Sequence, residues 1–328
     1  HTLAGVMDRC QSAMGSRLLR RWIQRPLRKP DVLRARYQAV ATLTEHKLIE
    51  SMSEQLDGIG DVERILSRVA LRSARPRDLS QLGGTLARLP ALRQTLQPLD
   101  APLLQGLREQ ISEHARQRDL LQRALIDNPP MLIRDGGVIA DGFDEELDDL
   151  RNIASNADQY LIDLETRERE RSGISTLKLG YNRVHGYYIE ISKGQAAKAP
   201  DDYTRRQTLK GAERYITPEL KEFEDKVLSA RERSLNREKI IYEELIDALI
   251  EVLGSLQNTA TALAELDVLT CFAERATALK LAQPEIVDVP CIDIRGGRHL
   301  VVEQVIDTPF VANDLQLSDR TRLQVITG

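Results

Sequence analysis

A stretch of chain without internal proline or glycine, from Pro218 to about Gly254, constrains the fold more than any other feature. Pro218 suits the first position of a helix, where a backbone N–H would have no partner in any case. At 1.5 Å per residue, a helix over this stretch would be roughly 55 Å long. Any fold for the chain must therefore accommodate one very long helix.

Apolar residues recur along this helix at the heptad spacing of helices that pack lengthwise. This seam comprises Leu220, Phe223, Val227 and Ala230, falters at Ser234 and Arg237, and resumes at Ile241, Leu245, Leu249 and Val252. A second seam, in a helix predicted to begin near Asp144, comprises Leu147, Leu150, Ala154, Ala157, Leu161 and Leu164. Two such seams, about 45 residues apart, predict an antiparallel helical arm with a separate structure at its tip.

The segment between the two helices is a different kind of sequence. "STLKLGYNRVHGYYIEISKG" alternates and is rich in Tyr and Ile, which predicts a hairpin turning near Asn182-Arg183. "RRQTLKGAERYIT" predicts one further strand. From Ser172 to Thr217, eight lysines and arginines stand against four acidic residues, a local charge of +4 in a chain of −4. The sequence therefore predicts a small basic β-module at the tip of the arm.

The two ends of the chain differ from each other. Residues 1–127 predict a compact helical bundle, with one helix starting after Gly15-Ser16 and another running from Pro76 to near Pro90. "DVERILSRVALRS" predicts a helix with an apolar face of Val62, Ile65, Leu66 and Val69. Beyond Pro284, the runs "IVDV", "CIDI" and "LVVEQV" predict short strands at the start of an α/β domain, and 323–327 predict a strand before Gly328. The expected fold class is mainly α.

Several functional classes are disfavoured. The three cysteines lack a CxxC pair, which argues against a disulfide framework or zinc site and favours a reducing, cytoplasmic location. No apolar run is long enough to span a membrane, and there is no signal peptide. No complete phosphate loop, GxSxG or HExxH motif occurs, and the acidic run "DEELDD" fits a helix N-terminus better than paired catalytic carboxylates. We expect no enzyme activity and no metal site.

The basic residues of the β-module are the candidate binding residues: Lys178, Arg183, Lys193, Arg205, Arg206, Lys210 and Arg214. On a rigid arm they would meet DNA phosphates, which gives affinity without sequence selectivity; a solvated β surface is the alternative. His185 is expected to bond local backbone. Tyr187 and Tyr188 must face opposite sides of a strand, so at most one could stack on a base. A second cluster is expected to line a helix face against acidic neighbours: Arg64, Arg68, Arg72, Arg75 and Arg77.

Six blocks resemble the bacterial MutS family of DNA mismatch-recognition ATPases: "MGSRLLRRWIQRPL", "GDVERILSRVALRSARPRDL", "DGGVIADGFDEELDDLR", "HGYYIEIS", "TLKGAERYITPELKEFEDKVL" and "GGRHLVVE". The resemblance runs from end to end. It implies a core and lever domain in 1–157 and 218–281, a clamp in 158–217, and the opening of an ATPase domain in 282–328. Because the first residue is His1 rather than Met, and Gly328 would be the first Walker A glycine, we expect an excised piece.

The resemblance also implies functional residues. Asn182 in "GYN" and Lys210 in "TLKGAERY" match positions that touch the DNA backbone, and Phe310 in "DTPFVAN" matches the aromatic that stacks on adenine. The family usually has Asn at Gly211 and commonly Pro at Leu300, so a side-chain contact is lost or replaced at the former. The full-length family uses ATP and magnesium, forms homodimers and works with a MutL-type partner. The hypotheses weighed against this one are a coiled-coil spacer whose β tip docks a protein, and an arm-bearing ATPase of the chromosome-maintenance type.

Overall fold

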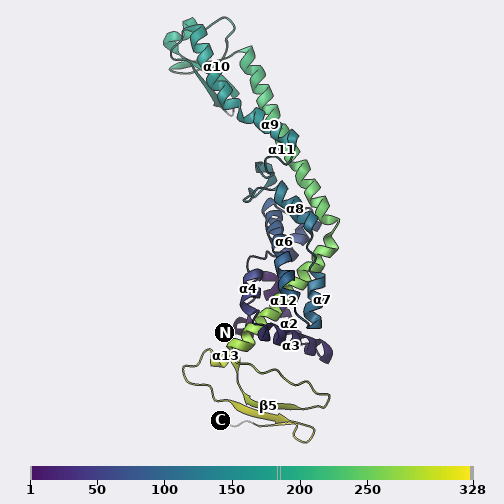
Figure 1. Ribbon diagram of the computed structural model, residues 1–328. Coiled ribbons are helices and arrows are strands. Elements are labelled where there is room, and N and C mark those ends of the chain that lie inside the picture. The colour runs from purple at the N-terminus through teal and green to yellow at the C-terminus, as the bar shows by residue number, and fades with distance from the viewer. Residues whose placement is uncertain (1, 183, 185, 326–328) are drawn as a thin grey trace. The chain divides into compact units, whose positions relative to one another are not determined.

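The computed structural model describes residues 2–182, 184 and 186–325 (Figure 1). The chain divides into two compact units, one formed by His1–Gln122 with Ile246–Gly328 and the other by Arg123–Leu245. The fold is mainly helical, with one four-stranded and one two-stranded antiparallel sheet. Of the helices described, none is long and apolar enough to cross a membrane.

The first unit is a helical bundle built around α12 (Leu253–Ala278). The preceding helices are α1 (Leu3–Met7), α2 (Ala13–Gln24), α3 (Pro30–Glu45), α4 (Ile49–Leu56), α5 (Val62–Ala70), α6 (Pro76–Leu96), α7 (Pro102–Gln110) and α8 (Ala115–Ala124), which reaches the second unit. α12 packs against α2, α3, α4, α5 and α7, and about half of its residues are buried. A helix that is apolar on most sides must be enclosed by others, which is why α12 forms the centre of this unit.

The bundle confirms part of the sequence interpretation and corrects part. The predicted apolar face of α5 is buried at all four positions. α2, however, begins at Ala13, because Ser12 caps it by accepting a hydrogen bond from the backbone N of Gly15 at 3.0 Å. The prediction that a helix ends near Pro90 is wrong, since α6 continues to Leu96. Leucines on both sides of Pro90 are buried, and their packing outweighs the one backbone hydrogen bond that proline removes.

The second unit contains a short 3-10 helix, η1 (Ile133–Asp135), followed by the helices α9 (Glu145–Ser155), α10 (Ala157–Ser172) and α11 (Pro218–Ile250). α11 is the longest of them and extends into the first unit. The helix start expected near Asp144 is confirmed, and Asp144 caps α9 by accepting from the backbone N of Leu147 at 2.9 Å. The single helix predicted from Asp144 is interrupted at Asn156, a residue type that competes with helical hydrogen bonding through its own side chain.

Side-chain contacts show how α9 and α10 lie against α11. Asp144, at the start of α9, pairs with Arg237, and Tyr160 on α10 stacks on Phe223 with ring centroids 4.2 Å apart. Residue numbers that increase along α9 and α10 are thus paired with residue numbers that decrease along α11. The helices therefore run antiparallel within this unit.

The ion pair between Asp144 and Arg237 makes a pH-dependent prediction. Hydrogen bonds from the Arg237 guanidinium lower the pKa of Asp144 below its ordinary value. The stability this contributes is complete above the unfolded pKa of about 3.9 and is lost as the pH falls through the lower, folded value. Asp144→Asn keeps a capping oxygen, so we expect it to reduce the free energy of unfolding by about 1 kcal/mol at neutral pH and progressively less below pH 4. Urea unfolding of the parent chain and of Asp144→Asn, from neutral pH to below pH 4, tests this prediction. A difference in the free energy of unfolding that does not change with pH would contradict it.

A four-stranded antiparallel sheet lies between α10 and α11 in the sequence. Its strands are β1 (Lys178–Asn182), β2 (Gly186–Ser192), β3 (Thr204–Thr208) and β4 (Ala212–Ile216), in the order β1-β2-β4-β3, with the 3-10 helix η2 (Lys193–Lys198) after β2. The predicted hairpin is confirmed, with Asn182 opposite Gly186. The segment "RRQTLKGAERYIT" was expected to form one strand but forms two, because 209–211 turn the chain and let β4 pair with both β2 and β3. We call this sheet with η2 the β-module.

Alternation along β2 divides the β-module into two faces. Tyr187, Ile189 and Ile191 are buried in its core, where Tyr187 also packs against Phe223 of α11. Tyr188 points to the other face, and the guanidinium of Arg214 lies over its ring at 4.0 Å. The two tyrosines therefore face opposite sides, as the strand periodicity predicts.

The C-terminal segment is a hairpin with a helical turn between its strands. It comprises β5 (Ile292–Gly297), α13 (Leu300–Glu303) and β6 (Asn313–Leu317), with β5 and β6 antiparallel. β5 confirms the strand predicted in "CIDI", but "IVDV" forms no strand. "LVVEQV" begins as helix because His299 caps it, accepting from the backbone N of Val302 at 3.2 Å. Leu323 and Val325 are exposed and have no strand partner in the described part of the chain, which corrects the strand expected there.

Candidate nucleic-acid interface

Three candidate lysines meet at one end of the β-module. Lys178 begins β1, Lys193 follows β2, and Lys210 lies in the turn between β3 and β4. The backbone N of Lys193 donates to the carbonyl oxygen of Gly211 at 3.2 Å, which joins two of these sites directly. All three side chains are exposed, and none forms an ion pair with another described residue. We call these three residues the lysine edge.

Asn182 lies at the opposite end of β1. The four residue steps from Lys178 to Asn182 span about 13 Å of extended strand. The Oδ1 atom of Asn182 accepts a hydrogen bond from the backbone N of Val184 at 2.8 Å, so this oxygen shapes the hairpin turn. An asparagine amide nitrogen can in addition donate to a phosphate oxygen. Arg183 and His185, both candidates from the sequence, lie outside the described residues.

Arg206 occupies an irregular position in β3. The strand register shifts between Arg205 and Gln207, which leaves Arg206 as the extra residue of a bulge. Its guanidinium is directed toward α11, where Nη2 lies 3.5 Å from Glu224 Oε1, and Nη1 donates to the carbonyl oxygen of Tyr187 at 3.4 Å. Arg206 therefore helps to hold the β-module on α11, a role that its position in a basic run did not indicate.

The two remaining arginines are also paired with carboxylates on neighbouring strands. Arg205 lies 3.1 Å from Glu213, and Arg214 donates to Glu190 at 2.8 Å. Both acidic partners were included in the local charge count, but that count could not show which cations they neutralise. The net charge of +4 is thus distributed unevenly: the three lysines of the lysine edge and Lys198 at the end of η2 have no carboxylate partner among the described residues.

Glu224 is a positioning residue that the sequence did not single out. It is buried, accepts from the backbone N of Tyr187 at 2.6 Å and forms an ion pair with Lys221 at 3.0 Å. Burial alone would raise the pKa of Glu224, but the Tyr187 hydrogen bond and the nearby cations outweigh it and lower the pKa. Gly186 has φ of 71°, and a Cβ atom there would lie 2.0 Å from Glu224 Oε2. Gly186 is therefore required for two reasons: its positive φ disfavours other residues, and a side chain would collide with the Glu224 carboxylate.

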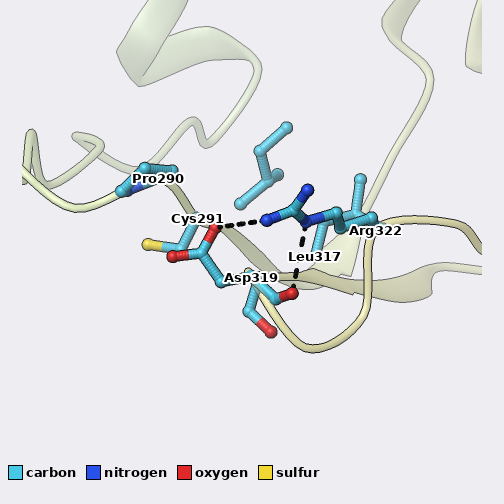
Figure 2. Close-up of a pocket in the computed structure, with 7 residues that line it drawn as sticks. Pro290, Cys291, Leu317, Asp319 and Arg322 are labelled. Carbon is cyan, nitrogen blue, oxygen red and sulfur yellow. Dashed lines mark hydrogen bonds and ion pairs between the residues drawn. The ribbon is translucent and has the colours of Figure 1, made fainter.

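The candidate nucleotide residues do not form a site among the described residues. Phe310 is half-buried in the segment between α13 and β6, and Gly328 lies outside the described residues. Figure 2 shows a nearby pocket of about 450 Å³, which Phe310 does not line. Arg322 forms an ion pair there with Asp319 at 3.5 Å, beside Cys291. No group of three or more His, Cys, Asp or Glu suited to a metal occurs in the described ranges.

The second arginine cluster has the structural role that was expected of it. Arg68 pairs with Asp78 at 2.5 Å and Arg64 with Asp61 at 3.4 Å, while Arg72 pairs with Asp247. The contact of Arg68 joins α5 to α6 and that of Arg72 reaches α11, whereas the contact of Arg64 lies within α5 and its cap. The cluster therefore offers no anion site comparable to the lysine edge.

Comparison with known families identifies the family to which the chain belongs. A family model described as MutS domain III matches residues 1–273. The match includes the helical bundle, the long helices and the whole β-module, and it ends within α12. Because the match covers most of its residues, the chain belongs to the MutS family of DNA mismatch repair proteins.

Proposed function

We propose that the β-module is a clamp that holds duplex DNA by its backbone, and that α9, α10 and α11 form the lever that carries it. The observation that supports this most is the lysine edge, where Lys178, Lys193 and Lys210 are exposed at one end of a sheet. Lysine ammonium groups are compact charges that bind phosphate without reading bases. Binding of this kind depends on salt and not on sequence.

Asn182 would make a separate contact with the backbone. Its distance of about 13 Å from Lys178 along β1 is too great for both side chains to reach one phosphate. A clamp with two such contacts would touch the duplex at successive phosphates, which fixes its orientation without base contacts. The buried anchor of Glu224 would keep the hairpin in place during this contact.

Replacing Lys210 with glutamate tests the clamp. We expect weaker binding to every duplex sequence and a reduction of about one in the slope of log K against log salt, as the loss of one phosphate contact requires. Fluorescence anisotropy over a salt titration measures both quantities. Lys239→Glu, an exposed position on α11, makes the same charge change away from the module and serves as the matched control. An unchanged slope, or an equal loss with Lys239→Glu, would contradict the assignment of Lys210.

Gel shifts with homoduplex and mismatched DNA separate the clamp from a protein-docking spacer. Equal binding to both duplexes is expected of a module that contacts only the backbone. Binding to neither would favour the coiled-coil spacer, and a preference for the mismatch would require base contacts that the lysine edge does not offer.

We also propose that the chain by itself hydrolyses no ATP. The sequence contains no complete phosphate loop, and no group of three or more His, Cys, Asp or Glu among the described residues is suited to hold magnesium. Phosphate release should equal that of buffer; hydrolysis that follows the protein through successive purification steps would refute the proposal. A homodimer and a MutL-type partner are extensions of the same proposal.

A further inference from the structure

A large cavity in the first unit is not used by the proposed DNA contact. It has a volume of about 840 Å³ and lies between α2, α3, the end of α12 and the residues that follow it. Its walls are mainly apolar and aromatic, with Trp22, Tyr37, Phe272 and Leu281 among them. Its size falls within the range of cavities that enclose drug-sized ligands.

One cation, Arg36, and one exposed carboxylate, Glu45, line this mainly apolar cavity. The guanidinium carbon of Arg36 lies 3.3 Å from the centroid of the Trp22 ring, and the side chain is only 17 % exposed. The nearest carboxylate is Glu265, at 3.9 Å. No described residue accepts a hydrogen bond from Arg36 Nε, which is buried. The guanidinium is therefore held in place by stacking on Trp22, while its buried Nε has no acceptor among the described residues.

The electrostatics of the pair agree with this geometry. Burial lowers the pKa of Arg36 and raises the pKa of Glu265, and in each case the opposite charge of the partner only partly offsets the effect of burial. A guanidinium stays charged in proteins, so a desolvated one gains most from an anionic acceptor at close range.

We propose that this cavity binds a small amphipathic anion, with an aromatic or aliphatic body and one carboxylate or sulfonate group. The anionic group would accept hydrogen bonds from Arg36, and the apolar body would cover Trp22 and Phe272, whose rings lie 6.1 Å apart. Stacking on Trp22 fixes the guanidinium before the ligand arrives, which reduces the ordering cost of binding. This site is independent of the lysine edge and of the proposed DNA contact.

Trp22 makes the site directly observable, because it is the only tryptophan in the chain. The probe is 8-anilinonaphthalene-1-sulfonate, titrated into the full chain while energy transfer from Trp22 is recorded. We expect saturable transfer at one site, and Arg36→Met should weaken it about tenfold or more, since the charge-assisted hydrogen bonds are lost. Arg21→Met, an exposed arginine on α2 that does not line the cavity, should leave binding unchanged.

A second variant tests the cavity without touching the cation. Ala276 is half-buried on its wall, and Ala276→Phe should fill the space and abolish transfer while the helical circular dichroism and thermal midpoint remain those of the parent chain. The uncharged probe N-phenyl-1-naphthylamine should bind the parent and Arg36→Met equally. If decanoate but not benzoate displaces 8-anilinonaphthalene-1-sulfonate, the ligand has an aliphatic body. If benzoate but not decanoate displaces it, the ligand has an aromatic body. Equal sulfonate affinity in Arg36→Met and the parent, or transfer that survives in folded Ala276→Phe, would overturn the proposal.

Discussion

Replacing Gly15 with alanine is expected to lower the free energy of unfolding of the helical bundle by about 4 kcal/mol. A Cβ atom at this position would lie 2.2 Å from Asp267 Oδ2 and 2.7 Å from its carboxyl carbon. Contacts this short require a backbone or side-chain shift. In most exposed helix positions the same substitution would be favourable, because alanine has the higher helix propensity.

Asp267 cannot move aside without losing its own contacts. It is 1 % exposed and accepts hydrogen bonds from the backbone N atoms of Gln11 and Ser12, at 2.9 and 2.8 Å, and from the Ser12 hydroxyl at 2.6 Å. Ser12 in turn caps α2. A displaced carboxylate would leave several buried polar groups without partners, each costing about 1–3 kcal/mol.

Gly84 provides the matched control for Gly15. It lies inside α6, is exposed, and a Cβ atom there would meet nothing within 4 Å. Gly84→Ala should therefore raise the free energy of unfolding by up to about 1 kcal/mol. Urea unfolding followed by circular dichroism measures both variants. If Gly15→Ala were as stable as Gly84→Ala, the close packing of α2 against Asp267 would be contradicted.

Replacing Glu238 with alanine is expected to reduce the free energy of unfolding of the second unit by about 3 kcal/mol. The Glu238 side chain is 2 % exposed and forms an ion pair with Arg151 of α9. It also accepts from the backbone N of Gly137 at 3.0 Å, so it joins the turn before α9 to α11. Without it, the buried backbone N of Val138, which donates to Glu238 Oε2 at 3.4 Å, loses its acceptor, and Arg151 keeps its contacts with Asp141 and the carbonyl oxygen of Ile139.

Glu146→Ala is the control for Glu238→Ala. Glu146 also pairs with arginines of α11, Arg233 and Arg237, but its side chain is 54 % exposed and both distances exceed 3.4 Å. An exposed pair of this kind contributes less than about 1 kcal/mol. Hydrogen exchange of the α9 amides should therefore accelerate strongly in Glu238→Ala and little in Glu146→Ala. Equal acceleration in the two variants would show that burial of Glu238 is not the cause.

The candidate interface shows that the sequence revealed a local excess of positive charge but not which of those charges are neutralised in the fold. Lys178, Lys193 and Lys210 were identified from a local excess of positive charge, and the structure brings them to one end of the β-module. The same charge count also included Arg206, which instead contacts Glu224 on α11. Nothing near Glu224 in the sequence distinguishes it from the other acidic residues of that helix. Its importance comes from a hairpin 37 residues away that brings the backbone N of Tyr187 to it.

Helical periodicity and strand alternation were readable from the sequence, because each depends on residues only two to seven positions apart. They predicted the long helix that begins at Pro218, the helix start near Asp144 and the opposite faces of Tyr187 and Tyr188. The tertiary structure decided which charges are neutralised, why Gly15 must lack a side chain, and how far α6 runs past its proline. These outcomes depend on partners that folding brings close together. Asp267, for example, lies 252 positions beyond Gly15 in the chain, and no local sequence pattern specifies such a partner.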